Sequence, residues 1–167
     1  FDAVNMDLIA GLPGEGVAEL LQSVEDCIRE QPENITVHTL AIKKGSKFGM
    51  ENVAQFASAA EAGDMVEQAR ARLAAAGYTP YYMYRQKYMA GNMENIGYTR
   101  AGHACVYNID IMEETVSVLA MGAGAASKRV YPTGGKIDRF IGLKDIPSYI
   151  ARVEEMAERK AALFSEG

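Results

Sequence analysis

A short apolar run near the start of the chain, from Val4 to Ala10, closes on Gly11 and Pro13 and leads directly into an amphipathic segment. A run of this length with this ending predicts a buried strand of a parallel sheet. In such sheets the loops after the carboxyl ends of the strands form the ligand crevice, where glycine lets backbone N–H groups approach a ligand. We therefore expect a functional site at the end of this strand.

Asp7 is the unusual residue within this run, because a carboxylate in an apolar strand must find a partner or face a cavity. Two interpretations stay open. The side chain either caps a neighbouring backbone N–H at the end of the strand or contacts a ligand.

The segments that follow alternate between helical and strand patterns. Apolar residues repeat at helical spacing over 17–28, and residues 35–42 are β-branched and mostly apolar. A strand, a helix and a strand predict a right-handed crossover between parallel neighbours, so both strand ends open on one edge. Residues 43–56 indicate a loop, and 59–76 a second helix that stops at Gly77.

The second half of the chain predicts mainly antiparallel strands. Residues 79–89 are rich in tyrosine and alternate enough for a strand, which 90–98 break with turn residues. Residues 105–112 and 115–121 predict two further strands that a hairpin joins at 113–114.

The chain closes with a short strand over 136–141 and a helix that has Asp145 as its N-cap and Pro147 in its first turn. The predicted buried stripe of this helix consists of Ile146, Ile150, Val153, Met156 and Leu163. The expected fold class is thus α/β, changing to α+β in the second half. The expected division is 1–78 and 79–167.

The composition narrows the class of protein. The 167 residues are 49% hydrophobic and carry a net charge of −5, which allows an ordinary core and opposes a general nucleic-acid binder. No apolar run is long enough to span a membrane, and no secretory leader opens the chain. Two distant cysteines, Cys27 and Cys105, indicate neither a disulfide framework nor a metal knuckle, so we expect a cytoplasmic protein. Phe1 stands almost inside a strand, which suggests a fragment of a longer protein.

Three apparent motifs have weak support. The Gly-rich segment 122–127 is similar to a dinucleotide fingerprint, but the extended character of 128–131 opposes the helix that this motif requires. The segment 11–16 lacks the Lys-Ser/Thr pair of a phosphate-binding loop. The two histidines, His38 and His103, have no second ligand at metal-binding spacing, which favours structural roles.

A basic set surrounds the tyrosine-rich strand and the Gly-rich segment: Arg85, Lys87, Arg100, Lys128 and Arg129. Lysine and arginine are common on solvated edge strands. Arginine also pairs bidentately with carboxylates, so a cradle for a substrate with several carboxylates is equally compatible with this set.

Five segments in order give the chain a family resemblance: 6–14, 37–41, 81–89, 92–99 and 119–127. Together they resemble the later part of an oxygen-independent coproporphyrinogen III oxidase, a radical S-adenosylmethionine (radical SAM) enzyme of the HemN/HemZ-like family. The resemblance implies the last βα units of a partial TIM-like barrel, followed by a C-terminal extension.

The resemblance also implies site residues and a reaction. Asp7, Ile9, Gly11, Ala41 and Ala126 match positions that lie near bound S-adenosylmethionine in this family. The substrate would be coproporphyrinogen III, two of whose four propionates are decarboxylated to vinyl groups by a radical mechanism. Substrate contacts are expected from the tyrosine-rich strand and the basic set, at Tyr84, Arg85, Lys87 and Arg129.

The chain departs from the family because the CxxxCxxC loop that holds the 4Fe-4S cluster is absent from it. Cys27 and Cys105 cannot replace three closely spaced thiolates, so the chain alone is expected to be inactive. Exposed barrel edges are expected to favour self-association.

Two other functions stay open. One is a haem-transfer relative, although the segment 92–98 has no histidine where such relatives carry a His-Asn-Leu motif. The other is a radical enzyme that acts on another carboxylated substrate.

Overall fold

A computed structural model of the chain describes residues 2–42, 57–85 and 93–165. The chain forms two compact units, Phe1–Met112 and Glu113–Gly167, each with its own sheet. Outside the described residues lie the loop predicted over 43–56, the end of the predicted tyrosine-rich strand (86–89) and the start of the predicted turn (90–92).

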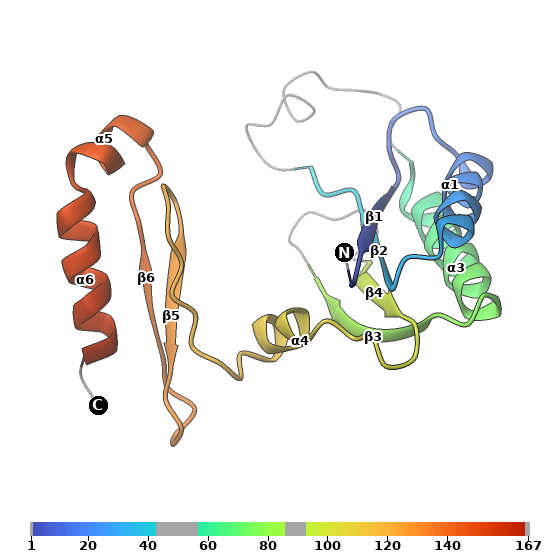
Figure 1. Ribbon diagram of the computed structural model, residues 1–167. Helices are drawn as coiled ribbons and strands as arrows, with labels where there is room; N and C mark the ends of the chain where they lie inside the picture. The colour runs from blue at the N-terminus through green and yellow to red at the C-terminus, as the bar shows by residue number, and fades with distance from the viewer. Residues whose placement is uncertain (1, 43–56, 86–92, 166–167) are drawn as a thin grey trace. The chain divides into compact units, whose positions relative to one another are not determined.

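The first unit is built on a four-stranded sheet in the order β1-β2-β4-β3 (Figure 1). As predicted, β1 (Asn5–Ala10) and β2 (Asn34–Thr39) are parallel neighbours. β4 (Asn95–Thr99) runs antiparallel to β2 and also to β3 (Thr79–Tyr84). The sheet is therefore mixed, with the predicted crossover at one side.

Two helices cover one face of this sheet, as their apolar stripes predict: α1 (Val17–Glu30) and α3 (Ala59–Ala75). The core that they form with the sheet includes Leu20, Val24, Cys27, Ile35, Val37, Met65, Ala69, Leu73, Tyr78 and Tyr98. Local signals fix where α3 begins, because Ser58 and Glu61 form a reciprocal capping box. The backbone N–H of Ser58 holds the pKa of the Glu61 carboxyl below its usual value.

Two predictions about the first unit were wrong. Asn95 to Tyr98 belong to the central strand β4, not to a turn. Residues 106–113 form the helix α4 (Val106–Glu113), not a strand, because a short apolar run does not by itself distinguish the two. The unit therefore continues to Met112, and the boundary expected at residue 78 falls before the strands β3 and β4 that complete the sheet.

β1 is also less buried than its composition predicts. Its side chains alternate in exposure, with Met6 and Leu8 packed on the core and Asp7 and Ile9 exposed. Among the described residues, β1 pairs with β2 alone, which leaves its other edge and one of its faces open.

The second unit is a hairpin of β5 (Ala126–Val130) and β6 (Ile137–Ile141), with α5 (Ile146–Ala151) and α6 (Val153–Ser165) after it. A strand rather than a helix begins at Ala126, so the dinucleotide fingerprint is ruled out. Of the strand predicted over 115–121, one antiparallel bridge is present, between Val118 and Lys128.

The predicted start of the terminal helical segment is confirmed, because the Asp145 carboxylate accepts a hydrogen bond of 2.9 Å from the backbone N–H of Ser148. Its predicted buried stripe is only partly right. Met156 is buried, whereas Ile146, Ile150 and Val153 are exposed. No helix in the described parts of the chain is long and apolar enough to cross a bilayer.

Two buried tyrosines allow a direct test of the packing of the first unit. The Tyr78 hydroxyl donates a hydrogen bond of 2.6 Å to the Pro32 carbonyl, which links the end of α3 to the end of α1. The Tyr98 hydroxyl is buried without a hydrogen-bond partner among the described residues. We expect Tyr78→Phe to lower the free energy of unfolding by about 1 kcal/mol.

The matched control is Tyr98→Phe, which removes an unsatisfied hydroxyl and is expected to leave the free energy of unfolding unchanged or raise it. Urea unfolding followed by circular dichroism measures both variants. A larger loss from Tyr98→Phe than from Tyr78→Phe would contradict this packing.

Candidate functional site

A cavity of about 410 Å³ lies at the carboxyl ends of β1 and β2, where the sequence predicts a site. Its walls come from β1, β2, the segment after β2, β3 and β4. The lining residues are Asp7, Ile9, His38, Thr39, Leu40, Ala41, Tyr84 and Asn95. Three of the five residues expected near S-adenosylmethionine are therefore brought together, along with one expected substrate contact.

The register of the strands explains why these side chains meet. Asp7 lies opposite Thr36 and Ile9 opposite His38, and alternate residues of a strand share a face. The intervening residues, Met6 and Leu8, pack against the helices. The face of the sheet that points away from α1 and α3 is thus polar and aromatic, in contrast to the apolar face beneath the helices.

The Asp7 carboxylate is held by side chains. It accepts a hydrogen bond of 2.7 Å from the Asn5 amide, and its oxygen lies 3.6 Å from Nε2 of His38. The Asp7 side chain is 60% exposed, so it retains room to accept a hydrogen bond from a ligand. The sequence allowed Asp7 either to cap a backbone N–H or to contact a ligand. The partners described here are the side chains of Asn5 and His38.

His38 joins β1 to the tyrosine-rich strand, a role that the sequence did not indicate. Its Nδ1 lies 3.3 Å from the Tyr84 hydroxyl, while its Nε2 faces Asp7. Among the described residues, no group of three or more metal-ligating side chains occurs. The arrangement therefore orders the polar wall of the cavity.

Tyr82 extends this wall along β3. Its hydroxyl lies 3.3 Å from the Thr36 hydroxyl, and its ring is nearly parallel to that of Tyr84. Glycine is required at position 97 because a Cβ there would overlap the Tyr82 ring. Burial raises the pKa of the Tyr82 phenol, so this group stays neutral around pH 7.

The ends of the two parallel strands are fixed by small and polar residues. Gly11 has φ of +87°, a backbone conformation that glycine adopts without strain. The buried side chain of Asn95 accepts a hydrogen bond of 2.8 Å from the backbone N–H of Thr39. The residue type of Asn95 predicted a turn. Instead, the pairing of β4 with β2 places its side chain at the end of β2.

The remaining predicted residues lie in both units, and one of them is outside the described residues. Arg85 follows β3 and pairs with Glu94 at 2.9 Å, whereas Lys87 lies outside the described residues. Ala126 and Arg129 lie on β5 in the second unit. The Arg129 guanidinium donates to the Leu163 carbonyl at 3.0 Å and stacks over the Tyr131 ring.

The cysteines provide no cluster site. Cys27 is buried in the core of the first unit, where burial raises the pKa of its thiol, and Cys105 is half-buried just before α4. The 4Fe-4S cluster that the resemblance implies needs three thiolates, and the whole sequence holds two cysteines. These two cysteines therefore cannot hold such a cluster by themselves.

Comparison with known proteins gives clear relatives. The chain is 44% identical over 94% of its length to the oxygen-independent coproporphyrinogen-III oxidase-like protein HemZ of Bacillus subtilis. It is 30% identical over 93% of its length to the heme chaperone HemW of Haemophilus influenzae. It spans 32% of the first relative and 37% of the second, and no protein-family model matches it.

A search of solved structures supports the fold. The coproporphyrinogen III oxidase HemN of Escherichia coli, described as a radical SAM enzyme, matches 93% of this chain and 35% of its own chain, with a TM-score of 0.64 and 18% identity. The mixed α/β architecture thus corresponds to part of the HemN fold. The chain belongs to the HemN/HemZ-like family of oxygen-independent coproporphyrinogen III oxidase-like proteins, as a segment of about a third of their length.

Proposed function

We propose that the protein that carries this chain is an oxygen-independent coproporphyrinogen III oxidase. The observation that carries the proposal is the convergence of Asp7, Ile9, Ala41 and Tyr84 on one cavity, in a chain that is 44% identical to an oxidase-like relative. The reaction removes a hydrogen atom from a propionate side chain, after which CO2 and one electron leave and a vinyl group remains. Two of the four propionates of the substrate react in this way.

The residues of the cavity fit the nucleoside part of S-adenosylmethionine. Ile9 is 40% exposed and offers an apolar surface to adenine, while the Asp7 carboxylate accepts hydrogen bonds from hydroxyl or amino groups. Gly11 and Ala41 leave space for the ligand, and Ala126 is included because it matches a position near bound S-adenosylmethionine in the family. Together with a 4Fe-4S cluster bound outside this chain, S-adenosylmethionine supplies the group that abstracts hydrogen.

The substrate contacts would come from Tyr84, Arg85, Lys87 and Arg129. Tyr84 lies on the cavity wall, and Arg85 follows it in the chain with an exposed guanidinium. Arginine and lysine pair with propionate carboxylates, and a tyrosine ring packs against a flat macrocycle. In this proposal these side chains hold the tetracarboxylate while one propionate reacts.

A haem-transfer protein is the second candidate, because two heme chaperones are also relatives, at 30% and 27% identity. Against this candidate stands the absence of histidine from 92–98, where the sequence resembles the His-Asn-Leu region of such proteins. The oxidase is therefore preferred.

The test is an anaerobic assay of the full-length protein, reconstituted with iron and sulfide and supplied with S-adenosylmethionine, a reductant and coproporphyrinogen III. We expect protoporphyrinogen and CO2 in a ratio of one to two, since two propionates react. Cleavage of S-adenosylmethionine without a divinyl product would overturn the oxidase assignment. Transfer of haem to an acceptor under those conditions would favour the chaperone.

Asp7 gives a test of the cofactor pocket that does not depend on the substrate. Asp7→Ala removes a carboxylate that faces the cavity, and we expect it to weaken S-adenosylmethionine binding by about tenfold, the effect of one charge-assisted hydrogen bond. Equilibrium dialysis of the reconstituted full-length protein measures this change.

The control for this variant is Asp26→Ala, which removes an exposed carboxylate that pairs with Arg29 on α1. We expect it to leave S-adenosylmethionine binding unchanged. Equal affinity in the wild type and in Asp7→Ala would exclude Asp7 from the pocket.

A further inference from the structure

The helix α6 carries a lysine in the middle of an apolar stripe. Val153, Met156, Ala157, Ala161 and Phe164 recur at helical spacing along this stripe. Lys160 occupies the position on the same stripe, between Ala157 and Ala161, where a core helix would carry leucine. Glu154, Glu155, Glu158 and Arg159 lie on the other side of the helix. The charge of Lys160 is therefore placed within the apolar face.

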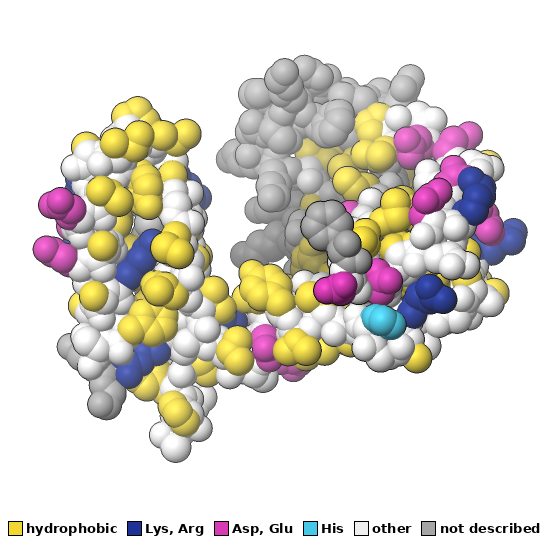
Figure 2. All heavy atoms as spheres, in the orientation of Figure 1, with side chains coloured by type: hydrophobic (Ala, Val, Ile, Leu, Met, Phe, Trp, Pro, Cys, Tyr) yellow, Lys and Arg dark blue, Asp and Glu magenta, His cyan; other side chains and the backbone are white. Residues whose placement is uncertain are grey.

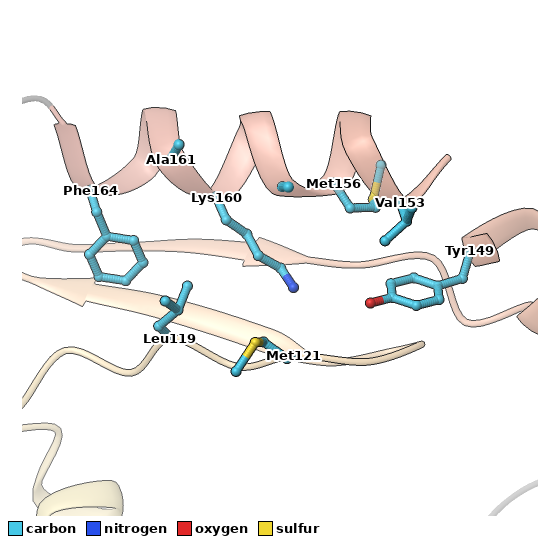
Figure 3. Close-up of a pocket in the computed structure, with 9 residues that line it drawn as sticks. Leu119, Met121, Tyr149, Val153, Met156, Lys160, Ala161 and Phe164 are labelled. Atoms are coloured by element: carbon cyan, nitrogen blue, oxygen red, sulfur yellow. The ribbon is translucent and has the colours of Figure 1, made fainter. Parts of the chain in front are cut away.

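This face of α6 lines an apolar groove of about 440 Å³ in the second unit (Figure 3). Leu119 and Met121 form the opposite wall, and Tyr149 of α5 closes one end. Met121 is 83% exposed and Leu119 58% exposed, so the groove is open to solvent. Figure 2 shows hydrophobic side chains gathered over this unit.

Lys160 lies at the floor of the groove. The residue is 8% exposed, and its ammonium group donates a hydrogen bond of 2.7 Å to the Ala120 carbonyl. Lys160 forms no ion pair with a carboxylate among the described residues, whereas the neighbouring Arg159 pairs with Glu155. A buried ammonium group with one neutral acceptor retains two N–H donors and an uncompensated charge, which costs free energy unless an anion approaches it.

We propose that this groove binds an amphiphilic monocarboxylate, a molecule with one carboxylate head and an unbranched apolar tail. The carboxylate would accept hydrogen bonds from the Lys160 ammonium group and from the Tyr149 hydroxyl, which points along the groove toward it (Figure 3). The tail would cover Leu119, Met121 and Phe164. Charge complementarity at Lys160 selects an anionic ligand over a neutral one.

The size of the groove suits this class of ligand. Its volume lies in the lower part of the range of small-molecule sites, roughly 300–1,000 Å³. None of its lining residues belongs to the cavity at β1 and β2. Binding in this groove is therefore tested without any measurement of turnover.

Isothermal titration of the 167-residue chain with dodecanoate, below its micelle concentration, tests the proposal. We expect binding of one dodecanoate per chain and at least about tenfold weaker binding of dodecanol, which lacks the charge. Lys160→Met keeps the apolar stem and removes the ammonium group, so it is expected to weaken dodecanoate binding by about tenfold and leave dodecanol binding unchanged. Equal affinity for both ligands, or no dodecanoate binding, would overturn the proposal.

Lys136→Met is the matched control, because Lys136 is an exposed lysine beside β6 and lies outside the groove. A second groove variant, Met121→Glu, guards against misfolding of Lys160→Met, since the exposed position 121 tolerates a carboxylate. It is expected to weaken binding of both ligands, and of dodecanoate more than of dodecanol, because the tail of each covers position 121 and only dodecanoate is repelled by a carboxylate. An unchanged dodecanoate affinity would overturn the proposal. Displacement of dodecanoate by coproporphyrin III would overturn the proposal, because the groove would then bind a porphyrin.

Discussion

The parallel pairing of β1 with β2 is the constraint on which the first unit depends. It aligns Asp7 with Thr36 and Ile9 with His38, so that polar and apolar side chains separate onto two faces of the sheet. One face buries Met6, Leu8, Ile35 and Val37 against the helices, and that burial stabilises the unit. The other face is left free to carry Asp7, His38 and Tyr84 around a cavity.

The antiparallel strands β4 and β3 complete this polar face. Because β4 pairs with both β2 and β3, Asn95 reaches the end of β2 and Tyr82 crosses Gly97. Removal of either contact would loosen the wall on which Tyr84 stands. The register of β3 against β4 thus sets where Tyr84 stands in the cavity wall.

Much of this unit was predictable because its signals are local. Apolar periodicity indicated β1, α1, β2 and α3, and Gly11 marked the end of β1, where the cavity lies. β4 was missed because Asn95 and Gly97 have the composition of a turn, and only pairing with two neighbours makes them a strand. Tertiary pairing of this kind overrides residue preference and leaves little trace in one sequence.

In the candidate site, too, some residues were predictable from the sequence and others depend on tertiary pairing. Asp7, Ile9 and Ala41 were predicted from the family resemblance, and Asp7 also because it is a carboxylate within an apolar strand. Tyr84 was predicted because it stands in a tyrosine-rich strand. His38 was set aside because it has no second ligand in sequence, although the pairing of β1 with β2 brings it to Asp7. The burial of Lys160 was equally hidden, since a lysine in an amphipathic helix is usually solvated.

The central claim is that the polar face of β1 and β2 holds the nucleoside of S-adenosylmethionine. A crystal structure of the full-length protein with S-adenosylhomocysteine tests it most directly. We predict adenine against Ile9, with the Asp7 carboxylate and the segment at Ala41 within contact of the nucleoside. Nucleoside density away from the ends of β1 and β2 would contradict the claim.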